Sequence, residues 1–275
     1  EVIHRDMPPP EKRDKERAIA SIAKAMAEIV QEWDGVPIRM PSRVKATPPG
    51  LLLLNSTSGI CSPLTLEAHV DGALPDAAFV WVGAHDLGHI AGCCAEAEAT
   101  LLGFAAGLRA DDPFARYAVA LDAYVDLARE LGGEKAKAAI NALPEAAKAD
   151  KRKASEVAQQ YNLRWLSERT WKVYNSYLKA QGVQDGVKNY ARGTSLFVYA
   201  CRKGLVAIGK TSPVLTAPPI PPAPSIPPAP STPPPPAMPP APAMPPTPPA
   251  TASAPASTPP ATAPEPEVQS GAPTE

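Results

Sequence analysis

Proline is distributed so unevenly that it limits which part of this chain can fold. Of the 37 prolines, 26 lie from Pro213 onward, among alanine, serine and threonine. This segment has almost no large apolar side chains, so burial cannot offset the entropy lost on ordering it. Proline runs such as residues 233–236 favour the stiff, solvated polyproline II helix. We therefore predict an extended lead-in over residues 1–10, one folded domain over residues 11–210, and a disordered Pro/Ala-rich tail over residues 211–275.

Hydrophobic periodicity within residues 11–210 predicts a mainly α-helical domain with a minor β element. Apolar residues recur every three or four positions up to Trp33, and Gly35 can supply a left-handed helix end. The segment 36–76 is rich in proline and glycine; in it, residues 51–54 predict a short buried strand and residues 67–70 a second extended piece. Helices are predicted over about residues 11–34, 76–90, 95–108, 113–131, 134–142, 144–181 (long enough to be broken) and 185–207.

Two aspartates are predicted to start helices. Asp76 is expected to cap an apolar, central helix that runs to about Ile90 and that Gly92 ends. Asp112, directly before Pro113, has the pattern of a capping residue followed by proline in the first turn.

Charge and cysteine content exclude several classes of function. The net charge of −1 and the lack of a basic block argue against a nucleic-acid partner. No apolar run is long enough for a membrane span, and no signal peptide is visible. The four cysteines, Cys61, Cys93, Cys94 and Cys201, lack C-x-x-C spacing and are interpreted as small apolar core thiols.

Two histidines carry the chemistry that the sequence suggests. His85 and His89 lie four residues apart on a predicted helix, so both imidazoles share one face and can reach one zinc ion at about 2.0–2.1 Å. Asp86 stands where the H-E-x-x-H motif has the glutamate that acts as general base. Gly92 lets the chain reverse, so that Glu96 or Glu98 can complete a two-His-one-Glu site with an open water position.

Two other interpretations of these histidines stay open at the level of sequence. A His-x-x-x-His pair is often only two histidines on one helix face. Alternatively, His85, His89 and Cys93 on one continuous helix, with Cys94 or Cys61 added, would form a closed structural zinc site.

Several segments in the same order resemble a bacterial domain-of-unknown-function family of membrane-anchored, gluzincin-like zinc metallopeptidases. The similar segments are residues 58–70, 85–92, 96–100, 112–117 and 175–190. The resemblance implies a zincin-like helical metallopeptidase domain, with Glu96 as the zinc ligand and Thr100 as the partner of a ligating histidine. The chain departs from the family pattern at Asp86, where the family has glutamate, and at Thr100, where it has asparagine.

The leading hypothesis is therefore a zinc-dependent peptidase. Asp86 would take a proton from the attacking water and pass it to the leaving amine. Tyr177, in a family-like segment, is the candidate for stabilising the oxyanion, with Tyr174 and Tyr190 as other late tyrosines.

Two further residues near these motifs have open roles. Arg116 either binds a substrate carboxylate or forms an ion pair. His69 either lines the cleft or is an ordinary surface histidine.

Two rival functions follow from the same residues. The shorter Asp86 suits a catalytically weak or inactive zinc-binding pseudo-peptidase that acts as an envelope-associated interaction module. Alternatively, the helical domain is an interaction module whose Pro-rich tail docks partner domains. The expected partners are a peptide or protein substrate, and a membrane or envelope component reached through an upstream anchor or the tail. The expected location is membrane-associated or exported in a bacterium.

Overall fold

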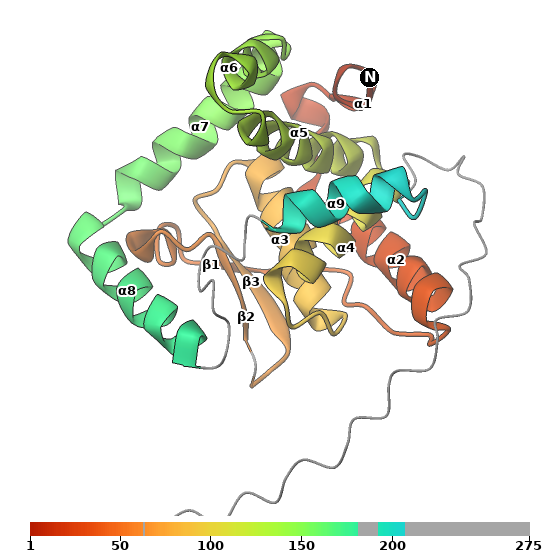
Figure 1. Ribbon diagram of the computed structural model, residues 1–275, viewed down its shortest axis with the longest axis horizontal. Coiled ribbons are helices and arrows are strands. Elements are labelled where there is room, and N and C mark those ends of the chain that lie inside the picture. Colours follow the sequence, from red (N-terminus) through yellow and green to blue (C-terminus); the bar gives the residue numbers. More distant parts are fainter. Residues whose placement is uncertain (63, 181–191, 207–275) are drawn as a thin grey trace, which may run out of the picture. The chain divides into compact units, whose positions relative to one another are not determined.

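The computed structural model describes residues 1–62, 64–180 and 192–206, without the side chains of residues 177–180. All of these lie in the first of two compact units, residues 1–220. The prediction of a mainly α-helical domain with a minor β element is confirmed (Figure 1). The elements are α1 (Val2–Asp6), the 3₁₀ helix η1 (Pro10–Lys12), α2 (Lys15–Asp34), β1 (Lys45–Thr47), the 3₁₀ helix η2 (Leu53–Asn55), β2 (Gly59–Ser62), β3 (Glu67–Asp71), α3 (Asp76–Ile90), α4 (Glu96–Arg109), α5 (Pro113–Glu130), α6 (Gly133–Asn141), α7 (Glu145–Tyr161), α8 (Arg164–Ala180) and α9 (Arg192–Arg202).

Helix α3 is the central element, as its apolar composition predicts. It packs against α2, α4 and α5, and the small sheet lies along its other side (Figure 1). Two glycines bring α3 and α4 into backbone contact. A Cβ added to Gly88 would lie 2.8 Å from the Ala99 carbonyl oxygen, and one added to Gly103 would lie 3.2 Å from that of Ala84. Because no side chain separates the two helices there, the start of α4 is fixed closely against the end of α3.

The three-stranded sheet has the order β1-β3-β2, with β1 parallel and β2 antiparallel to β3. Gly59 pairs with Val70, and Ile60 pairs with His69. Paired residues point to the same face, and neighbours along a strand alternate. Gly59 lies against α3, since a Cβ added there would meet the side chains of Val82 and Asp86. The side chains of Ile60 and His69 are therefore on the opposite face.

The predicted strand over residues 51–54 is wrong, whereas the extended piece at residues 67–70 is confirmed as β3. The reason is Asp71, a fully buried residue at the end of β3. Its carboxylate accepts hydrogen bonds from the backbone N–H groups of Gly50, Leu52, Leu53 and Ala73, at 2.7–3.1 Å. The apolar run therefore winds around this carboxylate as a turn and the 3₁₀ helix η2.

Helix boundaries follow the predicted pattern except at the start of α2, which begins at Lys15 after η1 rather than at residue 11, and the cap of α3 also differs. Gly35 ends α2 with φ 72°, and the side chain of Asp112 caps α5 through the N–H of Ala115, as expected. The predicted helix over residues 144–181 is broken between α7 and α8. Asp76 does not cap α3, because Pro75 occupies the N-cap position and Asp76 is already the first residue of the helix. The carbonyl of Pro75 accepts the first backbone hydrogen bond of the helix, from the N–H of Phe79. For the helix predicted over residues 185–207, the part before residue 192 lies outside the described residues, as does the predicted tail.

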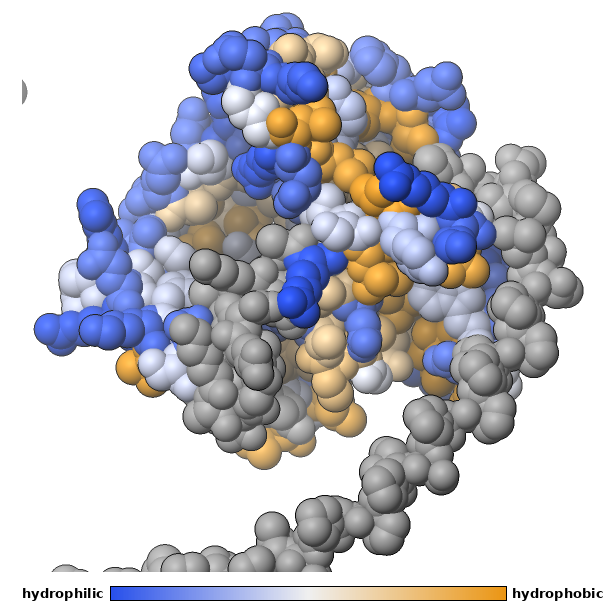
Figure 2. Space-filling view, viewed as in Figure 1, coloured by the Kyte–Doolittle hydropathy of each residue, from blue (hydrophilic) through white to orange (hydrophobic). Residues whose placement is uncertain are grey.

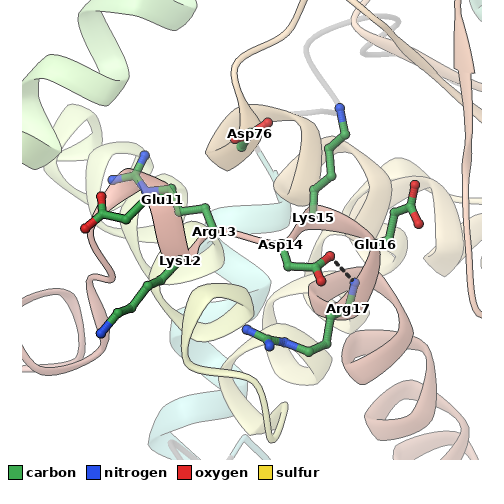
Figure 3. Close-up of a pocket in the computed structure, with 8 residues that line it drawn as sticks. All are labelled: Glu11, Lys12, Arg13, Asp14, Lys15, Glu16, Arg17 and Asp76. Atoms are coloured by element: carbon green, nitrogen blue, oxygen red, sulfur yellow. Dashed lines mark hydrogen bonds between the residues drawn. The ribbon is translucent and has the colours of Figure 1, made fainter.

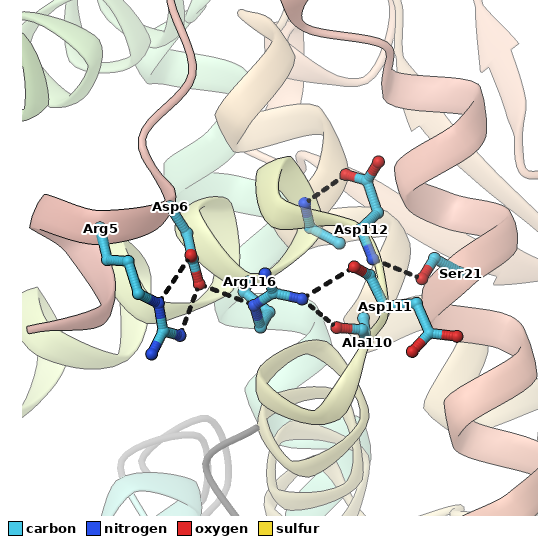
Figure 4. Close-up of polar contacts among 8 residues, drawn as sticks. Arg5, Asp6, Ser21, Ala110, Asp111, Asp112 and Arg116 are labelled. Atoms are coloured by element: carbon cyan, nitrogen blue, oxygen red, sulfur yellow. Dashed lines mark hydrogen bonds and ion pairs between the residues drawn. The ribbon is translucent and has the colours of Figure 1, made fainter. Parts of the chain in front are cut away.

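The predicted extended lead-in is also wrong, because residues 2–6 form helix α1. Ile3 is buried in the core, and the buried Asp6 accepts hydrogen bonds from Arg5 and Arg116 (Figure 4). Arg116 also donates to the backbone carbonyls of residues 110 and 111. Of the two roles considered for Arg116, the structure shows the ion pair, which ties α1 to the start of α5.

In the described part of the chain, no helix combines the length and apolar character that crossing a membrane requires.

Replacing Asp71 with alanine should leave four buried or partly buried backbone N–H groups without their acceptor. We expect a loss of about 3 kcal/mol in the free energy of unfolding, measured by urea denaturation. Glu134→Ala, at an exposed residue that has only a neighbouring lysine as partner, is the matched control and should change little. Equal stability of the two variants would contradict this role for Asp71.

The stabilising effect of Asp6 should depend on pH. The hydrogen bonds from Arg5 and Arg116 outweigh burial and hold the pKa of Asp6 well below its usual range. A group with a lowered pKa in the folded state contributes stability above its unfolded pKa, and the contribution is lost as pH falls toward the folded pKa. Asp6→Asn should therefore destabilise the protein at pH 7, and urea titrations should show the difference from wild type narrowing below about pH 4. A difference that stays constant to pH 3 would contradict this.

Candidate metal centre

His85 and His89 lie on one face of α3, near its C-terminal end. Their ring centroids are 4.9 Å apart, and each side chain is 17% exposed, so the pair is enclosed but reachable from solvent. Both Nε2 atoms face the same oxygen of Glu96, Oε2, at 3.0 Å from His85 and 3.4 Å from His89. Ligand atoms at bond lengths of about 2.0–2.1 Å around a tetrahedral zinc lie about 3.3 Å from one another. Glu96 Oε2 therefore lies at about this spacing from both histidine nitrogens, and all three donor atoms lie within 4.8 Å of one another, close enough to hold one metal ion.

The turn between α3 and α4 brings Glu96 to the histidines. Gly92 adopts φ 109°, and the N–H of Cys93 bonds back to the carbonyl of Gly88. The chain then reverses, and α4 begins at Glu96. Glu98 is exposed and is not part of the group of side chains that can hold a metal ion. Of the two glutamates that the sequence left open, the geometry places Glu96 beside the imidazoles.

The alternative of a closed site with cysteine on one continuous helix is wrong in its premise, because α3 ends at Ile90. Cys93 contributes its backbone carbonyl, which accepts a hydrogen bond from His89 Nδ1 at 2.7 Å. Burial raises the pKa of the Cys93 thiol to about 11, which disfavours the thiolate that a metal needs. Among the described residues, the group with metal-binding geometry is His85, His89 and Glu96.

Each histidine is oriented through its second ring nitrogen. His89 Nδ1 is held by the Cys93 carbonyl, and His85 Nδ1 lies 3.2 Å from Thr100 Oγ1. Partners of this kind fix ring orientation and tautomer in metal sites, and they leave Nε2 to face the ion. Thr100 thus occupies the place that the family resemblance implies for it.

Charge within the group is balanced around Glu96. Burial opposes ionisation of Glu96, but hydrogen bonds from His85 and His89 outweigh it and hold the pKa of Glu96 well below its usual range. Burial likewise opposes the charged form of His89, but its bonds to Glu96 and to the Cys93 carbonyl outweigh burial and raise the pKa of His89. Glu96 is therefore ionised at neutral pH and available as an anionic ligand.

Next to this group lies Asp86, whose Oδ2 atom has no hydrogen-bond partner among the described residues. The residue is 4% exposed. Burial is the main reason that the pKa of Asp86 is raised to about 7; the two histidines oppose this rise, and the negative charge of Glu96 adds to it. A Cβ added to Gly59 would lie only 2.3 Å from Oδ2, so strand β2 packs directly against this carboxylate. A buried acceptor without a donor among the described residues needs one from another source, such as water.

The remaining candidate site residues from the sequence either have other contacts or lie outside the described residues. The side chain of Tyr177, in α8, and the whole of Tyr190 lie outside the described residues. Tyr174 packs edge-on against Trp171, with ring centroids 5.9 Å apart. His69 is on the face of the sheet turned away from α3, with Nδ1 3.2 Å from the Glu67 carbonyl oxygen.

Sequence reasoning missed the contact of Gly59 with Asp86. A glycine inside a strand is a known signal of close backbone approach, but no strand is predicted at Gly59, which begins β2, so this contact had no usable cue. The Cys93 carbonyl had none, because a backbone atom leaves no trace in the sequence.

A concave region lies at the end of α3 opposite to the histidines. A pocket of about 660 Å³ is lined by residues 11–17 and Asp76 (Figure 3). Asp76 begins α3 and His85 follows nine residues later, about 13 Å along the axis. Acidic and basic residues balance in the pocket lining, and Arg13 and Arg17 are paired with Asp150 and Asp112. We therefore assign the chemistry to the histidine end of α3.

Comparison with known proteins assigns this domain to a family. A family model described as "Protein of unknown function (DUF3810)" matches residues 3–198. The chain belongs to this family. The DUF3810 match covers α1 to most of α9, including all three residues of the metal-binding group. No curated protein and no solved structure matches the chain. The resemblance to a domain-of-unknown-function family is thereby confirmed.

The geometry of this DUF3810 domain predicts its metal content. The purified full-length chain, after zinc reconstitution and desalting, should hold about one zinc per molecule by elemental analysis. His89→Ala and Glu96→Ala should lose the ion, because each removes one of three donors. Glu98→Ala is the matched control and should retain it. Retention of zinc in Glu96→Ala would show that Glu96 is not the ligand.

Proposed function

We propose that this protein is a zinc-dependent peptidase, with zinc held by His85, His89 and Glu96. The observation that carries the proposal is the buried Asp86 carboxylate, which lies beside this group with Oδ2 unpartnered. Three ligands from the described residues leave a fourth zinc position for water, and a general base is what a hydrolytic zinc site needs next to that position. A purely structural site would be closed by a fourth side chain and would not require a buried, unpaired carboxylate.

The roles of the residues follow from this arrangement. When bound, a zinc ion acidifies a water and polarises a carbonyl group. Asp86 accepts the proton of the attacking water at Oδ2 and delivers it to the leaving amine. Thr100 and the Cys93 carbonyl hold the imidazoles. The low exposure of the side chains of His85, His89, Glu96 and Asp86 limits competing water. Asp86 is one methylene shorter than glutamate, so it acts through a second water or after a small shift of α3.

The sheet supports a peptide as the substrate class. Strand β2 is an edge strand among the described residues, and its Gly59 lies directly against Asp86. An extended peptide can pair with such an edge through main-chain hydrogen bonds. The β2–β3 hairpin also exposes Ile60, Leu64 and Leu66, and apolar surface is visible along the lower margin of Figure 2, where this hairpin turns. These features favour a peptide with apolar side chains over a small polar substrate.

The second candidate is a zinc-binding pseudo-peptidase that acts as an envelope-associated interaction module. It rests on Asp86, since a shorter carboxylate reaches less far than the glutamate of H-E-x-x-H enzymes. In this case the metal stabilises the fold, and partners bind through the domain surface or the Pro-rich tail. Membrane-associated or exported location in a bacterium is part of both proposals.

Hydrolysis by variants at Asp86 separates the two candidates. If the protein is a peptidase, the zinc-loaded chain should cleave members of a fluorogenic peptide library, and Asp86→Asn should lower kcat/KM by about 100-fold or more while keeping its zinc. Glu98→Gln is the control and should cleave at the wild-type rate. No cleavage by a wild-type chain that holds zinc, together with cleavage by Asp86→Glu, would reject the peptidase and support the pseudo-peptidase.

A further inference from the structure

Thr100 lies where α4 meets two other helices. Its Oγ1 atom is 3.2 Å from His85 Nδ1 on α3, and the residue is 8% exposed. For Nε2 of a neutral imidazole to face a metal, the ring proton must be on Nδ1, and that N–H then needs an acceptor. A threonine within a helix can donate its hydroxyl proton to a carbonyl one turn back, which leaves its oxygen free to accept. Thr100 can therefore accept the Nδ1–H of His85.

The side chain of Thr100 is in turn confined by α9. A Cβ added to the buried Gly193 would lie 2.7 Å from both Cβ and Cγ2 of Thr100, and 3.1 Å from its Oγ1. The backbone of α9 thus rests on the threonine itself, and Figure 1 shows α9 lying across α4. The side chain of a threonine in a helix populates two χ1 rotamers when no neighbouring group favours one of them. Both the methyl carbon and the hydroxyl oxygen of Thr100 lie close to Gly193, so contact with α9 confines the side chain.

We propose that Gly193 of α9 positions Thr100, and through it His85, so that docking of α9 sets the metal affinity of the site. This inference rests on the zinc site of the proposed function and assigns a positioning role to a residue about a hundred positions away in the chain. Gly193 touches neither metal nor substrate. Its lack of a side chain allows α9 to come close enough to hold the hydroxyl of Thr100 against the imidazole.

The test measures zinc affinity of the full-length chain by competition with a chromophoric chelator. Thr100→Val keeps the shape of the side chain and removes the acceptor, so its zinc affinity should fall about 10- to 100-fold. Thr100→Ser keeps the hydroxyl and should recover much of that loss. Gly193→Ala should weaken zinc binding in the same direction as Thr100→Val, because the added methyl displaces Thr100.

A matched glycine separates positioning from general destabilisation. Gly107 lies on α4, the helix that carries Thr100, and packs against Val119 of α5. A Cβ added to Gly107 would lie 2.3 Å from the Val119 side chain. Gly107→Ala should lower the thermal midpoint of the metal-free protein as Gly193→Ala does, but should leave zinc affinity unchanged. In the zinc-loaded wild type, the Nδ1 proton of His85 should exchange slowly by NMR, and it should exchange faster in Thr100→Val and Gly193→Ala.

The outcomes are distinguishable. Wild-type zinc affinity in Thr100→Val or in Gly193→Ala, while His89→Ala loses zinc, would overturn this inference and leave the metal site standing. Equal loss of affinity in Gly107→Ala and Gly193→Ala would also overturn it, because the effect would then be one of stability alone. A wild-type chain that binds no zinc would overturn the proposed function and this inference together.

Discussion

The close approach of α3 and α4 is the constraint on which the candidate site depends. Gly88 against Ala99, and Ala84 against Gly103, bring two helix backbones into contact without an intervening side chain. A reversal at Gly92 then returns the chain so that Glu96, the first residue of α4, faces both imidazoles. A larger residue at Gly88 or Gly103 would push α4 away and separate the carboxylate from the histidines.

The balance of buried charge follows from that packing. Glu96 is ionised between two histidines, whose hydrogen bonds outweigh its burial. Asp86 is buried, its Oδ2 has no donor among the described residues, and its pKa is raised. The two carboxylates are close in sequence and differ in environment, which is the pattern by which protein sites divide the roles of ligand and base. The geometry shows where a metal ion fits. The proposed catalysis, in contrast, depends on how far the short side chain of Asp86 reaches.

Two polar anchors away from the site hold the scaffold that presents it. Asp71 gathers four backbone N–H groups at the end of β3 and fixes the loop that precedes β2. Asp6 and Arg116 tie α1 to the start of α5, which packs on α3. Strand β2 is thereby kept against Asp86, and α3 is kept central. The metal-binding group itself thus needs few direct supports beyond Thr100 and the Cys93 carbonyl.

The sequence alone determined the elements whose signals are local. The spacing of His85 and His89, the apolar composition of α3, the caps at Gly35 and Asp112, and the break near Gly92 all act within a few residues, and periodicity or turn chemistry reveals them. Tertiary structure decided what depends on distant partners. Residues 51–54 form a 3₁₀ turn because Asp71 binds their N–H groups, and residues 2–6 form a helix because Arg116 pairs with Asp6. The choice of Glu96 over Glu98, and the contact of Gly193 with Thr100, were likewise fixed only when packed helices brought these residues together, because a sequence pattern contains no distances between elements.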